Sequence, residues 1–495
     1  MKTCPLKKLA LVALTLALSA GCAVGPRYSR PAAPAPTEYK ETPPNWKLAQ
    51  PADQVLRGDW WEIYCDPTLN ELEAKVNIGN QTLKAAQAQF EQARAAIRYA
   101  RASLYPNISV NPSATRERLS GNRPLGGLTG PVTTNDLILP VDMSYEPDVW
   151  GSVRSTVQNA RATAQASFAD LELVNLSVHA ELAMDYFQAR DLDAQAQLLD
   201  YTVAGYEKAL QLTENRHTGG VASEVDVAQA QTQLETARAQ DIDTRGQRKY
   251  YEHAIAMLIG LPASTFTFPE VPLNAQPPVL PPGLPSQLLE RRPDIAGAER
   301  RIAAANANLG VARAAYFPVF NLFPDAGFEG DSITNWLTGP SGFAAVGISA
   351  LETVFDAGKR RSISGQYRAA YNQAVANYEQ SVLTAYQEVE DNLSALRILE
   401  QEAATQAAAI AAAQHSLQLS NNRYRGGVTN YLEVITAQNI ALSDEVTGVQ
   451  IAGRRMVDSV LLIKALGGGW GMASTIPIKT SAAAPPGSGN AGAAE

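Results

Sequence analysis

The chain has 495 residues, of which 45% are hydrophobic and 18% are charged, and its formal net charge is -8. This acidic balance excludes nucleic acid as a partner, because a DNA or RNA interface needs a basic face. The glycine and proline contents are ordinary for the length, which excludes collagen-like and wholly disordered chains.

Residues 1–21 have the layout of a secretory signal peptide, because three lysines precede an uncharged apolar run. The small residues after this run lead to Cys22. This arrangement resembles the lipobox of bacterial lipoproteins, with Ser19 where that motif usually has leucine. We therefore expect a covalent lipid on Cys22. The alternative is an ordinary cleavage site followed by a chance cysteine.

Behind this anchor we expect an extended N-terminal segment over residues 22–66. Cys4 lies in the signal peptide and Cys22 is expected to be acylated, so Cys65 remains alone and no internal disulfide is expected. The later sequence has no run of the roughly 18 apolar residues that a membrane-spanning helix needs. Any membrane-spanning part is therefore expected to consist of strands.

The rest of the chain contains one unit written twice. The stretch RHTGGVASEVDVAQAQ (216–231) recurs 207 residues later as RYRGGVTNYLEVITAQ (423–438), and Gly151 recurs as Gly358 at the same spacing. Upstream of these glycines the spacing becomes 212 residues. The sequence thus divides into a first repeat at 67–261, a proline-rich linker at 262–285, a second repeat at 286–466 and a flexible tail at 467–495.

Each repeat is expected to contain a strand hairpin, at about 106–147 and at about 317–353. In the first repeat, apolar and polar residues alternate over 137–145, and the partner strand is expected around 108–118. Strands of this length and pattern suit a bilayer, although an ordinary half-buried sheet is the alternative. Four strands cannot close into a barrel, so membrane insertion would require self-assembly, and three copies would supply twelve strands.

Each repeat also predicts a very long helix. Between residues 171 and 210 a seven-residue pattern places apolar residues at ten of twelve positions, and the second repeat does the same. A helix of roughly 60 residues would reach about 90 Å, which is typical of a coiled-coil hairpin. Glycine pairs would end both helices in tight turns: Gly219, Gly220, Gly426 and Gly427. Ser223 and Asn430 can cap the returning helices.

Several spaced motifs resemble one known family. They are WWEIYCDPTLNEL (60–72), SYEPDVWGSVR (144–154), GLPSQLLERRPDIAGAER (283–300), FDAGKRRS (355–362), RYRGGVTNYLEV (423–434) and KALGGGW (464–470). They are similar to the TolC-like outer-membrane factors, in the efflux lipoprotein branch that includes NodT and OprM. The resemblance implies a mostly α-helical chain with four membrane β-strands. Three copies would form a twelve-stranded outer-membrane barrel above a periplasmic α-helical tunnel.

The resemblance also implies the function. The homotrimer would be a lipid-anchored exit channel in the outer membrane of a Gram-negative bacterium, and it would dock with a periplasmic adaptor and an inner-membrane efflux pump. A periplasmic coiled-coil adaptor or scaffold lipoprotein is the alternative.

The family places a periplasmic gate at the turn between the long helices. Two acidic family positions match Glu433 and Thr436, of which the first alone is acidic, and Asn439 stands where some relatives have arginine. Leu432 is the candidate apolar plug, and Asp226 is the first repeat's counterpart of Glu433. A ring of like charges from three copies would favour opening or bind cations. The alternative is that Glu433 is a solvated residue that interacts with the helix dipole.

Enzymatic chemistry has little support in the sequence. The four histidines, among them His179, lie far apart without metal-site spacing, and no phosphate-binding or nucleophile-elbow motif occurs. The acidic cluster of Glu388, Glu390 and Asp391 is interpreted as the wet face of a long helix. We therefore expect no enzyme, no metal site and no cofactor apart from the lipid on Cys22.

Overall fold

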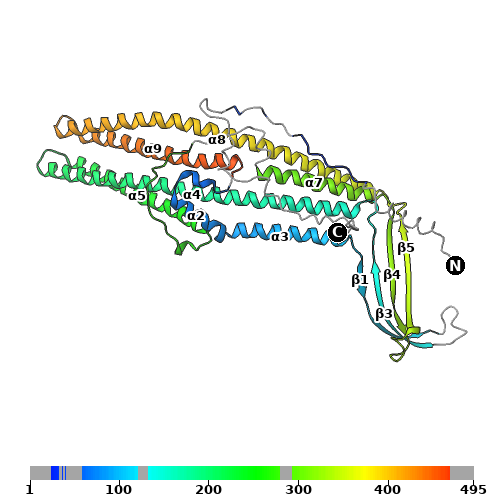
Figure 1. Ribbon diagram of the computed structural model, residues 1–495. Helices are drawn as coiled ribbons and strands as arrows, with labels where there is room; N and C mark the ends of the chain where they lie inside the picture. The colour runs from blue at the N-terminus through cyan, green and yellow to red at the C-terminus, as the bar shows by residue number, and fades with distance from the viewer. Residues whose placement is uncertain are drawn as a thin grey trace, which may run out of the picture.

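The computed structural model describes residues 24–32, 36, 39–40, 58–120, 132–278 and 292–468. The predicted signal peptide, Cys22 and the tail beyond residue 468 lie outside the described residues. A long bundle of helices extends from one end of a narrow sheet (Figure 1). None of the helices in the described part of the chain combines the length and apolarity that crossing a membrane would require.

The two repeats build the same helices. Three pairs have equal lengths: α3 (Gln81–Ala102) with α7 (Pro293–Ala314), α4 (Ser152–Thr218) with α8 (Lys359–Arg425), and α5 (Glu224–Leu258) with α9 (Tyr431–Ala465). The first pair is offset by 212 residues and the other two by 207, which are the spacings seen in the sequence. The long helices α4 and α8 contain 67 residues each. The two helical hairpins run side by side to tips far from the sheet (Figure 1).

The strands of both repeats join in one antiparallel sheet in the order β1-β3-β4-β5. Its strands are β1 (Asn107–Val110), β2 (Ser113–Leu119), β3 (Val132–Ser144), β4 (Val319–Gly330) and β5 (Gly342–Leu351). The predicted single strand at 108–118 is wrong in one respect, because Asn111 and Pro112 divide it into β1 and β2. Both pieces pair with β3, one beyond the other. Proline has no N–H to donate to a sheet, which accounts for the break.

The main hydrophobic core lies partway along the bundle. There η2 (Trp60–Tyr64) and α2 (Pro67–Gly79) pack against α4. Asp66 caps α2 by accepting from the backbone N–H groups of Thr68 and Leu69 at 2.9 and 3.2 Å. The same carboxylate accepts from the Tyr186 hydroxyl at 2.5 Å, which ties the short helix to the long one.

The described part of the proline-rich linker contains the short helix η4 (Ala263–Thr265) and an extended segment fixed to the first hairpin. The Arg190 guanidinium donates to the carbonyl of Pro269 at 2.6 Å. Asp193 accepts from the N–H of Val271 at 3.0 Å and from the Arg248 guanidinium at 2.7 Å. The linker is thus a strap tied to α4 and α5, a role that its composition did not predict. In the second repeat a further short helix, η5 (Gly339–Ser341), precedes β5.

Candidate functional site

Both helical hairpins turn at a glycine pair. In each pair only the second glycine has a left-handed backbone, with φ of 72° at Gly220 and 71° at Gly427. Gly219 and Gly426 have φ of -77° and -76°, which other residues also adopt. One left-handed glycine thus ends each long helix, as the glycine pairs predict, and the left-handed residue is the second of each pair.

The returning helices begin with matching caps. The Ser223 hydroxyl accepts from the N–H of Asp226 at 3.2 Å, and the Asp226 carboxylate accepts from the N–H of Ser223 at 3.0 Å. This reciprocal pair is a capping box. In the second hairpin the Asn430 side chain accepts from the N–H of Glu433 at 3.3 Å. Asp226 and Glu433 thus occupy equivalent positions in the first turn of a helix, where the helix dipole favours an acid.

Glu433 is ion-paired within its own chain. Its carboxylate lies 2.7 Å from the Arg423 guanidinium and also accepts a hydrogen bond from the Thr429 hydroxyl. The Thr436 hydroxyl donates to the Leu432 carbonyl at 2.9 Å, so its hydrogen bond stays within the helix. The Leu432 side chain is 54% exposed. The sequence pattern did not predict the pairing of Arg423 with Glu433, although the repeat aligns Arg423 with Arg216.

The tips of the two hairpins are tied to each other. The Arg216 guanidinium donates to the Tyr424 carbonyl at 3.1 Å and lies 4.5 Å from the centre of the Tyr424 ring. Further along, the Gln233 amide donates to the Asn439 side chain at 2.5 Å. Asn439 therefore joins α5 to α9.

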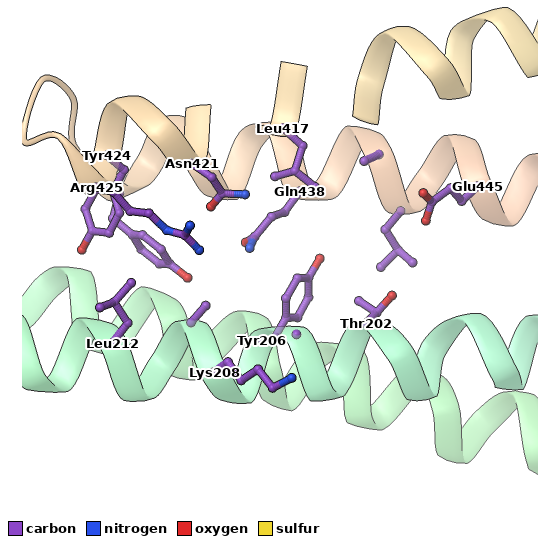
Figure 2. Close-up of a pocket in the computed structure, with 15 residues that line it drawn as sticks. Thr202, Tyr206, Lys208, Leu212, Leu417, Asn421, Tyr424, Arg425, Gln438 and Glu445 are labelled. Atoms are coloured by element: carbon purple, nitrogen blue, oxygen red, sulfur yellow. The ribbon is translucent and has the colours of Figure 1, made fainter. Parts of the chain in front are cut away.

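A cavity of about 370 Å³ lies between the hairpins just behind these ties. Figure 2 shows Tyr206 of α4 facing Gln438 of α9 across it, with Tyr424 and Arg425 of α8 at one end. Two buried polar atoms in its lining, the Tyr424 hydroxyl and the Gln438 side-chain oxygen, have no hydrogen-bond partner.

The acidic cluster lies far along the chain from the tip. Glu388 and Asp391 are exposed, as the sequence interpretation expects, but Glu388 and Glu390 also have partners outside α8. Glu388 accepts from Arg292 at 2.6 Å, and Arg292 is only 7% exposed. Glu390 accepts from the N–H of Lys40 at 2.7 Å. These carboxylates hold α8 against neighbouring segments.

His179 is a buried structural residue. Its Nδ1 lies 2.5 Å from Glu73, its Nε2 lies 3.2 Å from Asn77, and the Trp61 ring stacks on it. Burial lowers the pKa of His179 to about 4 and raises the pKa of Glu73 well above its usual value. Both shifts favour the uncharged forms of the two groups. Among the described residues no group of three potential ligands could hold a metal ion.

The comparisons with known proteins cover almost the whole chain. A family model described as outer membrane efflux protein matches residues 74–261 and 284–468. The toluene efflux pump outer membrane protein TtgC of Pseudomonas putida is 31% identical over 466 residues, which cover 94% of this chain and 96% of TtgC. The pyoverdine export outer membrane protein OpmQ of Pseudomonas aeruginosa is 30% identical, over 94% of this chain and 97% of OpmQ.

A solved structure of the outer-membrane channel OprN has the same fold, with a TM-score of 0.85. It is 29% identical in sequence, and the match covers 91% of this chain and all of OprN.

Proposed function

The chain belongs to the outer membrane efflux protein family, and we propose that it is the exit channel of a tripartite efflux system. It lies in the outer membrane and passes substrates out of the cell from an inner-membrane pump through a periplasmic adaptor. The observation that carries this proposal is similarity to efflux channels over 94% of the chain, together with one sheet and two long hairpins in the same molecule. A separate periplasmic adaptor or scaffold is therefore not favoured.

The uncovered faces of the single chain support assembly with further copies. Thirteen residues of α7 are buried, because this helix packs on both α4 and α8. Its counterpart α3 packs on α4 and buries two residues, Phe90 and Ala100. A second copy that places its α8 against α3 would supply the neighbour that α7 already has. Within the described strands, β5 and the β1/β2 edge likewise pair on one side only.

The internal contact predicts the contact between copies. In one chain, Asp170 of α4 lies 2.5 Å from Arg301 of α7. The spacing of 207 residues relates Asp170 to Asn377 in the second repeat, and the spacing of 212 relates Arg301 to Gln89 in the first. Asn377 and Gln89 are both exposed. Similarly, Gly297 packs on Ala169, and the corresponding residues are Ala85 and Ala376. Both pairs are chemically compatible, because Asn377 and Gln89 are both amides and Ala376 and Ala85 are both small. We propose a closed trimer, in which three copies give a twelve-stranded barrel and a tunnel of helices.

The tips form the periplasmic gate in this proposal. Leu432 provides the apolar constriction because its exposed side chain lies at the start of α9. Glu433 contributes a ring of three carboxylates, each paired with Arg423 in the closed state. Asp226 and Thr436 support the turns through the capping box and the intrahelical hydrogen bond.

The lipid on Cys22 fits the path of the first described residues. Val24 donates from its N–H to the Trp150 carbonyl at 3.3 Å, and Asn306 donates to the Pro26 carbonyl at 3.0 Å. These contacts hold the chain just after Cys22 where α4 begins beside the sheet. A lipid at this point would enter the membrane next to the strands. A single acyl chain binds a membrane only weakly, so the lipid would add to the anchoring that the strands provide.

The relatives TtgC and OpmQ are named for toluene and pyoverdine, which differ greatly in chemistry. We infer that the pump, rather than this duct, selects the substrate. No enzymatic step is part of the proposed function.

Deletion of the gene in its host tests the function. Loss of the channel should raise the intracellular accumulation of a fluorescent pump substrate, and a plasmid copy should restore export. A plasmid copy of the same gene that lacks residues 106–147 should reach the periplasm without restoring export. Recovery of the full-length protein as a soluble periplasmic monomer, with unchanged accumulation in the deletion strain, would contradict the proposal.

A further inference from the structure

The cavity between the hairpins has the construction of a ligand site. Its volume of about 370 Å³ lies within the range of small-molecule pockets. Helices from both repeats form its walls, with α4 on one side and α8 and α9 on the other (Figure 2). Any molecule held there touches both halves of the duplicated chain.

Two of its polar groups are buried without a partner. Gln438 is 8% exposed and Tyr424 is 5% exposed, yet neither the Gln438 Oε1 nor the Tyr424 hydroxyl has a hydrogen-bond partner. A buried polar atom without a partner is costly, and such atoms are rare in folded proteins. The Gln438 oxygen can only accept, so the missing partner is a hydrogen-bond donor. Because both atoms are covered by protein atoms, a ligand between the hairpins reaches them only after neighbouring side chains of the lining move aside.

Two cations stand at the edges of the same cavity. Lys208 projects from α4 and Arg425 from α8. Both side chains are exposed, and neither makes a hydrogen bond or ion pair with another described residue. The acid in the lining, Glu445, accepts a hydrogen bond from Gln414 at 2.6 Å. Gln414 is neutral and does not cancel the charge of Glu445. With Lys208, Arg425 and Glu445 counted together, the lining has a formal charge of +1, which favours an anionic group near the two cations.

The remaining walls are aromatic and aliphatic. Tyr206, Tyr424 and Tyr431 present their rings, and Leu212 and Leu417 add apolar surface. Flat apolar walls of this kind suit a planar ring.

From these features we propose that the cavity binds a small hydroxylated aromatic carboxylate. Its carboxylate lies toward Arg425 and Lys208, its ring lies among the tyrosines, and its hydroxyl donates to the Gln438 oxygen. The site goes beyond the proposed efflux function and does not depend on it. Since the Tyr424 ring also lies under the Arg216 guanidinium, a bound ligand is coupled to the tie between the two tips.

Titration calorimetry of the purified full-length protein tests this site with three probes. We expect 4-hydroxybenzoate to bind saturably at one site per chain. Benzoate lacks the hydroxyl that would meet the buried Gln438 oxygen, so it should bind about tenfold more weakly. Phenol lacks the carboxylate that would meet the exposed Arg425 and Lys208, so it should bind up to about fivefold more weakly. Equal affinities for the three probes, or no saturable binding of 4-hydroxybenzoate, would overturn the proposal without using any variant.

Variants then assign the contacts. Gln438→Leu should remove the advantage of 4-hydroxybenzoate over benzoate, and Arg425→Gln should reduce its advantage over phenol. Gln231→Leu is the matched control, because this exposed glutamine lies 207 residues before Gln438 in the first repeat. An unchanged ligand preference in Gln438→Leu, or the same loss in Gln231→Leu, would remove Gln438 from the site. If the protein restores export but does not bind 4-hydroxybenzoate, the ligand site is wrong and the proposed efflux function is unaffected.

Discussion

Arg423 and Glu433 decide how much charge the proposed gate carries. Arg423→Ala removes the guanidinium 2.7 Å from the Glu433 carboxylate and would leave three unpaired acids around the axis of the proposed trimer. We expect the reconstituted channel to become more cation-selective and more sensitive to block by multivalent cations. Single-channel recordings measure both properties. Glu433→Ala should lower both, and Glu214→Ala, at an exposed acid of α4, should change neither. Wild-type behaviour in the first two variants would remove the pair from the gate.

The glycine turns give a prediction that separates the two members of a pair. Gly427→Ala places a side chain on a left-handed backbone, which costs about 1 kcal/mol. The amide hydrogens of the tip should therefore exchange about fivefold faster, because local opening becomes easier. Gly426→Ala is the control, since its Cβ would lie 3.4 Å from the Asn422 carbonyl in ordinary contact. Hydrogen exchange followed by mass spectrometry measures these rates. Equal exchange rates at the tip in Gly427→Ala and Gly426→Ala would contradict the special role of Gly427.

Asp191 of α4 packs closely against Gly453 of α9 and makes the contact between these helices depend on pH. Burial raises the pKa of this carboxyl to about 6, while a hydrogen bond from Gln195 opposes the rise. Because the pKa in the folded chain exceeds the unfolded value, stability falls as pH rises from about 4 to about 6 and then stays level. Asp191→Asn should therefore stabilise the protein at pH 7.5 by about 2 to 3 kcal/mol and should have little effect at pH 4.

Thermal unfolding of the wild type and of Asp191→Asn at both pH values measures this effect. Asp243→Asn, at an exposed position of α5, should shift the unfolding midpoint equally at both pH values. If Asp191→Asn shifts the unfolding midpoint equally at pH 4 and pH 7.5, then ionisation of the Asp191 carboxyl does not destabilise the folded chain, and the prediction is wrong.

At the level of elements, the strap of residues 266–273 depends on one carboxylate. Asp193 lies 2.7 Å from Arg248 and 3.3 Å from Arg190, and both arginines are buried. Asp193→Asn removes the negative charge that compensates the two buried arginines. We therefore expect the free energy of unfolding to fall by about 3 kcal/mol and proteolysis of the strap to become faster. Asp200→Asn breaks an exposed ion pair with Arg245 and should cost less than about 1 kcal/mol. Similar proteolysis rates in the two variants would contradict this role.

The helices could be predicted from the sequence because the repeat and the seven-residue pattern are local signals. The spacings of 207 and 212 residues match the observed helix bounds. Pro112 is also a local signal, because proline favours the break between β1 and β2. The glycine turns and the Ser223 cap were visible for the same reason.

The side-chain partners could not be predicted in this way. The contacts of Glu433 with Arg423, Glu388 with Arg292 and His179 with Glu73 each join a helix to a separate segment of the chain. Which residues meet depends on the rotation of each helix about its axis, and this is set by packing along its full length. The cavity near Gln438 has the same origin, so no local pattern indicated it.

For the whole molecule, the central claim is that three chains close into a ring in which the contact between copies repeats the contact within one chain. A Cβ built on Gly297 lies 3.4 Å from the Ala169 Cβ, close to disulfide geometry. Oxidation of outer membranes containing the Cys65→Ser, Ala85→Cys, Ala376→Cys protein, followed by denaturing electrophoresis, tests this claim. The matched control carries Ala169→Cys and Gly297→Cys and should form its disulfide within one chain. We predict a covalent ladder that stops at the trimer for the first protein and a monomer for the control; a monomer for both proteins, or a ladder that continues beyond three, would contradict the closed ring.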